Sequence, residues 1–414
     1  MPSKSLEPNY FDQPRVPPAP AGRGRRLAPA LALCPLLLGA CAMEPRVAFT
    51  EADQAAAVPL AARTIRFWAD SPGSLFQKAA RTAVARKGQP FTYLALSGGG
   101  GGGAYGAGVL NGWSESGNRP EFTVVSGVST GALIAPFAFL GPAYDARLKK
   151  IYTDGEAKSL ISDPNPLGAI FGGGLFGSER LRQFVERDVD DDMLAAIASE
   201  DAKGRRLLVV TTNLDAQRAV IWDIGAIAAS GAPKAYKLCR DVLAASASLP
   251  VIFAPQLIDV DANGHSFQEM HVDGGVSTPV FTLPDMYLFG GKTIATGRAQ
   301  PQLYVILNKR IDPVFEVVPD QTFKIAERSI SAMNRFGTQA ALTQTYKFAR
   351  SKNMGFHMSY IGDDAPKAPG SDFETEAMRN LYGYGYEKAR SGSFWETTLP
   401  QIEAAKSAAK TAEQ

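Results

Sequence analysis

Residues 91–103 read FTYLALSGGGGGG, and residues 122–131 read FTVVSGVSTG. Each stretch joins an apolar run, typical of a buried strand, to a glycine-rich turn. The small and apolar residues that follow the two turns predict helices at 103–114 and 130–140. Two successive strand–turn–helix units indicate an α/β fold, in which helices cover a sheet.

The rest of the chain continues this alternation. The run LLVVTT at 207–212 is apolar on both faces, as expected for a mostly parallel sheet covered on two sides. The Asp-Ser-Pro-Gly sequence at 70–73 leaves at most two short helices within 64–85. Further strands are expected at 219–224, 303–307 and 355–362, and helices at 178–185, 192–198, 373–389 and 321–349, the last with a break near Gly337.

This pattern predicts one three-layer α/β/α domain over 90–400, between a tether with a helical segment at 41–89 and a frayed tail at 401–414. The chain has 414 residues, 45% of them hydrophobic, and a formal net charge of +2, which does not indicate nucleic-acid binding. Its three cysteines and three histidines form no cluster in sequence, so we expect no metal and no cofactor. Cys239 is expected to be a small buried side chain.

The N-terminal segment has the pattern of an export signal. A basic cluster at 23–26 precedes the apolar run LAPALALCPLLLGA at 27–40, which is short for a membrane span. The run ends in Leu38-Gly39-Ala40-Cys41, which resembles a bacterial lipobox. We therefore expect a cleaved signal peptide at 1–40 and a lipidated Cys41 that attaches the protein to a membrane surface of the bacterial envelope, on the outer-membrane or periplasmic side. The alternatives are a plain signal peptide and a cytosolic protein with an unusual N-terminal tail.

The G-x-S-x-G sequence at 127–131 places a serine at a strand-to-helix turn. Such a turn strains the serine backbone, and Gly127 and Gly131 leave room where strand and helix nearly touch. Ser129 then lies at a helix N-terminus, whose dipole and free N–H groups favour an oxyanion. The pattern predicts Ser129 as a nucleophile for acyl carbonyls and the Thr130 N–H as one oxyanion donor.

The glycine run permits two interpretations. As an oxyanion loop, it lets backbone N–H groups point into a site with no Cβ in the way, and the donors come from Gly98, Gly99, Gly100, Gly101, Gly102 and Gly103. As a phosphate loop, it lacks a following Gly-Lys-Ser/Thr, and the next strand ends in the serine turn rather than in an acidic residue. We therefore expect no bound nucleotide.

A nucleophilic serine needs a base. His265 lies in a predicted surface turn, and His357 lies in a predicted strand. His271 stands two residues before Asp273, in the sequence His-Val-Asp-Gly-Gly at 271–275. An aspartate before paired glycines indicates a carboxylate presented on a tight turn, although an ordinary Asp-Gly-Gly turn is an equally good interpretation of the triplet alone.

Together these segments resemble a known family. LALSGGGGGGAYGAGVL at 94–110, GVSTG at 127–131 and Asp-Gly-Gly at 273–275 are similar, in order and rough spacing, to the motifs of patatin-like phospholipases. The resemblance spans 91–307, and the Ala-Ser-Leu-Pro sequence at 247–250 resembles a family segment that lines the acyl pocket. It implies a patatin-like fold and hydrolysis of lipid acyl esters by a Ser–Asp dyad, with no catalytic histidine, metal or cofactor.

The resemblance also implies roles for individual residues. Ser129 is the implied nucleophile, Asp273 the implied general base, and glycines 98–103 the implied oxyanion loop. The implied motif glycines are Gly127, Gly131, Gly274 and Gly275. The family commonly has Arg or Lys where this chain has Gly102, so a cation near the oxyanion or a lipid phosphate is missing. This departure bears on phospholipid head-group preference more than on ester hydrolysis, because the backbone donors stay.

Two other functions are compatible with the same residues. An acyltransferase would pass the acyl chain to an alcohol instead of water, and a catalytically silent envelope scaffold would keep the fold without turnover. The apolar, glycine-rich stretch at 170–176 suits a lid over the site, with an ordinary loop as the alternative.

Overall fold

The computed structural model describes residues 46–61, 65–71, 89–162, 164–165, 174–282, 299–366, 373–392 and 394–400. Contacts divide the chain into Met1–Pro45 and Arg46–Gln414, and every described residue belongs to the second unit. The expected signal peptide, Cys41, the tail at 401–414 and most of the expected lid lie outside the described residues.

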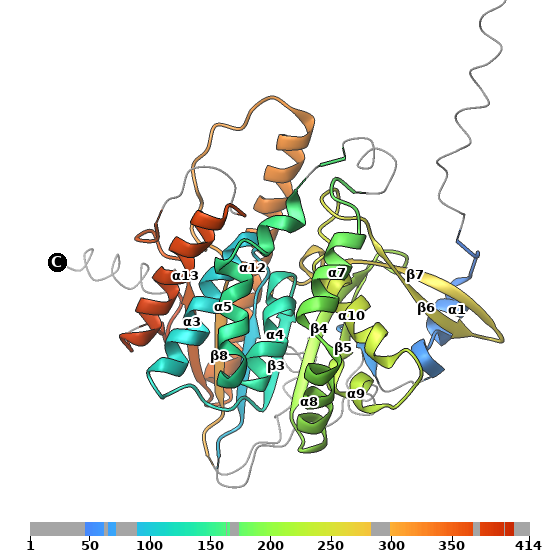
Figure 1. The fold of residues 1–414 in the computed structure, drawn as a ribbon, viewed down its shortest axis with the longest axis horizontal. Helices are drawn as coiled ribbons and strands as arrows, with labels where there is room; N and C mark the ends of the chain where they lie inside the picture. The colour runs from blue at the N-terminus through green and yellow to red at the C-terminus, as the bar shows by residue number, and fades with distance from the viewer. Residues whose placement is uncertain are drawn as a thin grey trace, which may run out of the picture. The chain divides into compact units, whose positions relative to one another are not determined.

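One mixed sheet forms the centre of the described unit (Figure 1). Neighbouring strands in the order β4, β3, β2, β8 and β9 run parallel, whereas β5 is antiparallel to both β4 and β1. The strands of this path are β1 (Arg66–Trp68), β5 (Arg218–Asp223), β4 (Arg206–Asn213), β3 (Val124–Val128), β2 (Thr92–Leu96), β8 (Gln302–Leu307) and β9 (Gly355–Tyr360). The expectation of a mostly parallel sheet is confirmed.

A long hairpin extends from the sheet beside β4. Its strands are β6 (Gln256–Ala262) and β7 (His265–Asp273), which pair in the register Gln256↔His271 to Ala262↔His265. The last residues of β7 pair with β4, in the register Thr211↔Asp273 to Asn213↔His271. Asp273 therefore reaches the sheet at the end of the hairpin.

Helices cover both faces of the sheet. Alternate residues of β2 point to opposite faces, as a strand requires. Leu94 and Leu96 pack in one core, whereas Tyr93 and Ala95 pack in a second core together with α12 (Thr322–Ser351). The first core receives α3 (Gly103–Glu115), α4 (Thr130–Leu140), α5 (Asp145–Thr153), α7 (Glu179–Asp188), α8 (Asp191–Ala202), α9 (Ile224–Ala229), α10 (Ala235–Ser246) and α13 (Thr375–Arg390). This is the predicted three-layer arrangement, and free Cys239 is buried in it.

Most predicted elements are present within about two residues of their expected bounds, but two expectations differ from the structure and several elements were not predicted. Arg66–Trp68 is a strand rather than part of a helix, because its backbone pairs with β5 while Phe67 is buried. The β6–β7 hairpin, α5, α9 and α10 were not predicted. The long helix α12 continues through Gly337, where a Cβ would lie 3.2 Å from Pro279 Cγ, so this glycine allows a close approach instead of a break.

The segment that precedes β1 contains the short helix α1 (Glu51–Ala56), which a capping box between Thr50 and Asp53 begins. Phe49 stacks on Phe267 of β7, and Val58 forms a bridge with Asp261 of β6. The segment 46–58 is thus packed on the β6–β7 hairpin. Within the described part of the chain, no helix is both long and apolar enough to cross a membrane.

Candidate active site

Ser129 occupies the turn between β3 and α4. Its backbone has φ 57° and ψ −127°, a conformation that costs a non-glycine residue energy and that clusters at functional sites. A Cβ on Gly131 would lie 2.4 Å from Leu96 O, and one on Gly127 would lie 2.4 Å from Gly131 O. The two motif glycines are therefore required by close backbone approach. The Ser129 N–H donates to Ser246 Oγ at 3.1 Å, which fixes the turn against α10.

Asp273 is buried beside Ser129. Its Oδ1 accepts a hydrogen bond of 2.6 Å from Gly275 N–H. Its Oδ2 is also buried, and among the described residues it has no partner that satisfies hydrogen-bond geometry. Burial raises the pKa of the Asp273 carboxyl to about 6, and the neighbouring Ser129 hydroxyl opposes that rise. The two side chains are thus neighbours, with one carboxylate oxygen left open to a proton.

The backbone of Asp273 is held from two sides. Its N–H donates to Ser248 O at 2.9 Å, and its carbonyl oxygen accepts from Thr212 Oγ1 at 3.0 Å. A Cβ on Gly274 would lie 2.3 Å from Val210 O, so the residue after the aspartate also needs glycine. This packing presses the Asp-Gly-Gly turn against β4.

The glycine run lies against the residue that follows β8. Asn308 donates from Nδ2 to Ser97 O at 2.7 Å and from its backbone N–H to Ser97 Oγ at 2.9 Å. Its carbonyl oxygen would lie 1.9 Å from a Cβ on Gly99 and 2.2 Å from one on Gly102. At the other end of the run, a Cβ on Gly98 would lie 2.9 Å from Ser129 Cβ. The run is therefore wedged between Asn308 and the serine turn.

The seven predicted oxyanion donors fall into two groups. Gly98 N–H donates to Pro279 O at 3.4 Å, Gly102 N–H donates to Gly99 O, and Gly103 N–H donates to the carbonyl oxygens of Gly100 and Gly101. Among the described residues, the N–H groups left without a protein acceptor are those of Gly99, Gly100, Gly101 and Thr130. Gly99, Gly100, Gly101 and Thr130 therefore have backbone donors available to a ligand.

A mostly apolar cavity of about 390 Å³ reaches Ser129 and Thr130. This volume is in the range of about 300–1,000 Å³ that is usual for small-molecule sites. Ala247, Leu249 and Pro250 of the sequence-predicted pocket segment line it, whereas Ser248 instead donates to Ala244 O. The other apolar lining residues include Leu133, Ile151, Leu160, Leu181, Phe184, Ile252, Phe253 and Ile330. Of the expected lid, the described residues Leu175 and Phe176 line the cavity.

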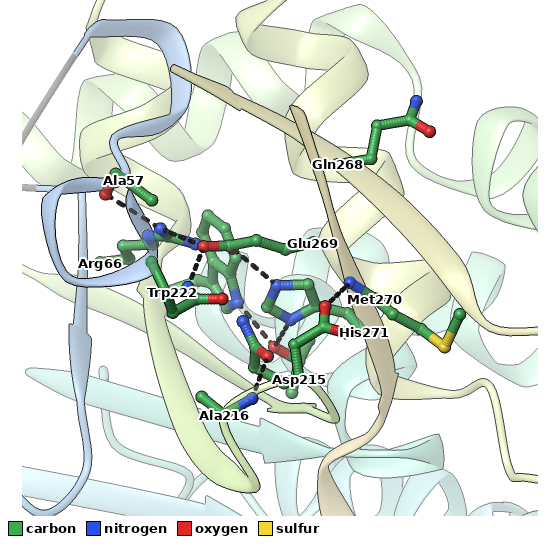
Figure 2. Close-up of polar contacts among 12 residues, drawn as sticks. Ala57, Arg66, Asp215, Ala216, Trp222, Gln268, Glu269, Met270 and His271 are labelled. Atoms are coloured by element: carbon green, nitrogen blue, oxygen red, sulfur yellow. Dashed lines mark hydrogen bonds and ion pairs between the residues drawn. The ribbon is translucent and has the colours of Figure 1, made fainter. Parts of the chain in front are cut away.

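His271 takes part in a buried polar network rather than in the site (Figure 2). Figure 2 shows Glu269 between Arg66 and His271, and His271 Nε2 lies 3.1 Å from the Glu269 carboxylate. Burial raises the pKa of Glu269, but hydrogen bonds from His271 and Arg66 lower it to about 2, so this carboxylate is ionised and only accepts. Burial lowers the pKa of His271, so its ring is neutral and carries its proton on Nε2.

The second ring nitrogen of His271 completes the network. Nδ1 lies 2.9 Å from Thr211 Oγ1. The same Thr211 oxygen accepts a hydrogen bond of 2.8 Å from Trp222 Nε1. Because a neutral ring with its proton on Nε2 has an acceptor at Nδ1, the Thr211 hydroxyl donates to it. The direction of donation runs from Trp222 through Thr211 and His271 to Glu269. The network pins β7, the strand that ends in Asp273, to β4 and β5.

The other two histidines lie outside the site. His265, which begins β7, is partly exposed, and its Nε2 lies 3.8 Å from Asp53. His357, in β9, stacks on Tyr304 and bonds to Gln302 Oε1. In the parts of the chain that the structure describes, no group of three His, Cys, Asp or Glu side chains could hold a metal ion.

Two residues beside the site were missed from the sequence. Asn308 supports the glycine run through its hydrogen bond to Ser97 O, and Lys309 is the cation whose charge lowers the pKa of Asp273. A signal was available, because both follow directly after the predicted strand at 303–307. The carboxyl ends of parallel strands meet at one edge of a sheet, so residues there belong beside Ser129.

The fold is an α/β fold with a mixed, mostly parallel central sheet. Residues 94–284 match the family model described as patatin-like phospholipase. The matched region contains both Ser129 and Asp273 but ends before Asn308 and Lys309.

Two solved structures show weaker similarity. The crystal structure of VipD from Legionella pneumophila is 15% identical, with 75% of this chain and 70% of that chain covered and a TM-score of 0.32. The structure of the type III effector protein ExoU is 15% identical, with coverages of 76% and 58% and a TM-score of 0.17. These TM-scores are too low to relate the folds in detail. No curated protein matched the chain.

Proposed function

We propose that the protein is a serine acyl hydrolase that cleaves lipid acyl esters through Ser129 and Asp273. One observation carries the proposal. A serine held in a strained turn lies beside a buried carboxylate whose Oδ2 has no hydrogen-bond partner among the described residues, and the serine lines an apolar cavity. Nucleophile, base and acyl-binding space are the three components that ester cleavage needs in one place.

The reaction follows from these positions. Ser129 Oγ attacks the ester carbonyl carbon, while its proton passes to Asp273 Oδ2 and the carbonyl oxygen becomes an oxyanion. Collapse of the tetrahedral species expels the alcohol, which takes the proton from Asp273 and leaves an acyl-serine. Water then attacks this ester and gives a proton to Asp273. Expulsion of Ser129 Oγ, which takes that proton, releases the carboxylic acid and restores the site.

The oxyanion is stabilised by backbone donors. Gly99, Gly100, Gly101 and Thr130 have N–H groups with no acceptor among the described residues, and Thr130 begins α4. Donors fixed by the glycine run and by a helix N-terminus need no reorganisation when charge develops on the substrate. Of the predicted donors, we assign the role to these four.

Burial makes Asp273 a stronger general base, because it raises the pKa of the carboxyl group. An exposed aspartate, with a pKa near 3.9, is a weak base for a hydroxyl. With the pKa raised to about 6, the carboxyl is still mostly ionised at neutral pH but accepts a proton more readily. The dyad therefore needs no histidine, in agreement with the placement of His271 inside the β7 network.

The substrate class follows from the cavity. Its lining is dominated by aliphatic and aromatic side chains, which favour an acyl chain over a polar leaving group. Lys324 and Glu327 of α12 are the charged residues in the lining. The acyl part of the ester thus binds along α4, α5 and α7, and the leaving alcohol faces outward.

Labelling with a fluorophosphonate probe tests the proposal. The wild-type protein should become labelled at Ser129, and Ser129→Ala should lose both labelling and turnover, by about 10⁴-fold or more in kcat. A panel of p-nitrophenyl esters and phospholipids then defines the acyl length and head group. Ser230→Ala is a matched control, because it removes an exposed serine that follows α9 and does not line the cavity. Equal labelling of wild type and Ser129→Ala would contradict the proposal.

We further propose that the protein is an envelope lipoprotein anchored through Cys41. The support is the sequence Leu-Gly-Ala-Cys at 38–41 after a short apolar run. Anchoring would keep the enzyme at a membrane that holds its lipid substrate. The mass of the N-terminal peptide, isolated from a membrane fraction, tests this: diacylglyceryl-cysteine at position 41 is expected, and an unmodified N-terminus would contradict it.

A further inference from the structure

Lys309 is a charged residue close to the site that the proposed reaction has not used. It follows β8 and is the next residue after Asn308, whose carbonyl oxygen touches the glycine run. The side chain is half-buried, and its Nζ reaches Thr338 of α12. An ammonium group in such surroundings is costly unless an acceptor or an opposite charge compensates it.

The hydrogen bonds around Lys309 fix where its charge lies. Nζ donates to Thr338 Oγ1 at 3.2 Å, and the same hydroxyl donates to Asn334 O at 2.6 Å. Asn334 in turn lies beside Gly275, since its Oδ1 would be 3.7 Å from a Cβ there. Gly275 N–H binds the Asp273 carboxylate. The Lys309 ammonium group and Gly275, which follows Asp273 closely, thus both lie against one turn of α12, at Thr338 and Asn334.

The charges of Lys309 and Asp273 interact electrostatically. Burial lowers the pKa of Lys309 to about 8, and the charge of Asp273 opposes this. Burial raises the pKa of Asp273, and Lys309 is the charged residue that opposes it. Among the described residues, neither side chain forms an ion pair of 4.0 Å or less with any other group.

We propose that Lys309 is a positioning residue of this site, whose charge keeps the Asp273 carboxylate ionised and ready to accept the proton of Ser129. The inference rests on the proposed hydrolase function. Thr338 is the acceptor that holds the ammonium in place. The glycine run has no charged side chain, and a side chain on Gly102 would collide with Asn308 O, so the cation comes from the end of β8 instead.

The test compares kcat/KM for a p-nitrophenyl ester across pH in three variants. Lys309→Met removes the charge, Lys309→Arg keeps it, and Arg310→Met removes the neighbouring exposed cation that pairs with Asp363. In Lys309→Met the acidic limb should move to higher pH by about one unit, which lowers kcat/KM about fivefold at pH 6 and leaves it nearly unchanged at pH 9. Lys309→Arg and Arg310→Met should keep the wild-type limb.

A purely structural role would lower activity equally at all pH values, and that result overturns the proposal. So does an unchanged profile in Lys309→Met. If this variant does not fold, Lys309→Gln takes its place. A double-mutant cycle of Lys309→Met with Asp273→Asn on the free energy of unfolding measures the same coupling without turnover, and additive effects overturn the proposal. Absence of probe labelling in the wild type would instead overturn the hydrolase function itself.

Discussion

The Ser129 half and the Asp273 half of the site are held in different ways. Ser129 is fixed by backbone against backbone, where Gly127 and Gly131 let β3, α4 and the end of β2 approach one another. Asp273 is fixed at the end of a hairpin, whose last strand is tied down by the side chains of Arg66, Thr211 and Glu269.

This difference separates local from distant information. The glycines that fix Ser129 lie within the short stretch 127–131, because each of them is itself the residue at a close backbone contact. The Asp273 half depends on residues as far apart as Arg66 and Lys309, which only the folded chain brings together. Backbone contacts tolerate no added atom, whereas a side-chain network spreads its energy over several bonds. Substitutions in the two halves should therefore have different effects.

The largest effect is expected for Asp273→Asn, which should abolish turnover and yet stabilise the fold. Ionising a buried carboxyl with a pKa of about 6, compared with 3.8 when unfolded, costs the native state about 2–3 kcal/mol at neutral pH. Because the native pKa is raised, this cost is absent below about pH 3.8 and complete above about pH 6. Urea unfolding at pH 4 and pH 7.5 measures it.

The variant should therefore exceed wild type in stability at pH 7.5 and equal it near pH 4. The same ionisation predicts that kcat/KM of the wild type falls below about pH 6. Turnover by Asp273→Asn within tenfold of wild type would show that another group is the base.

Gly131→Ala tests the backbone-held half. The added Cβ would lie 2.4 Å from Leu96 O and 2.7 Å from Ser97 O, and backbone atoms there have no room to move. We expect a loss of about 3 kcal/mol or more in unfolding free energy, together with loss of activity. Gly383→Ala in α13 is the matched control, because its Cβ would meet nothing within 4 Å. That control should be neutral or slightly stabilising.

The smallest effect on activity is expected for His271→Ala, which tests the side-chain-held half. The variant should lose about 2–4 kcal/mol of stability through the cavity and the freed Thr211 hydroxyl, but keep more than a tenth of wild-type turnover. Burial lowers the pKa of His271, so the wild type should lose part of its stability as pH falls through about 6.5, and the variant should not. Thermal unfolding across pH, with His265→Ala as control, measures this. Complete loss of turnover in a folded His271→Ala protein would favour a Ser–His mechanism.

Much of the fold was predictable because it is built from buried strands and helices with strong local patterns. The run TYLAL of β2 is buried at every position, and α4 has the predicted bounds of 130–140. The β6–β7 hairpin was missed although a local signal was available, because Asn263-Gly264 between two runs of alternating polar and apolar residues is typical of a β-hairpin. Arg66–Trp68 was misassigned because three residues carry too little periodicity, and pairing with β5 decides their structure.

The candidate site was predictable to the same extent. Ser129 and Asp273 were predicted from motifs, and their side chains are neighbours in the structure, whereas their catalytic roles are a proposal. The sequence could not show which glycine N–H groups are left for an oxyanion, because this depends on the carbonyl oxygens to which Gly98, Gly102 and Gly103 donate. Lys309 was missed for a different reason, since a single lysine after a strand is unremarkable until its charge is seen to lie by a buried carboxylate.

The packing of the N-terminal segment on the β6–β7 hairpin sets a practical boundary for making the protein in recombinant form. Trimming to the matched region at 94–284 would delete Arg66 and leave buried Glu269 without its guanidinium partner. It would also delete Arg46, which forms an ion pair of 2.7 Å with Asp215 and donates to Gln268 O. Expression should therefore start at or before residue 46 and extend past α13, even though neither end contains one of the sequence motifs of the site.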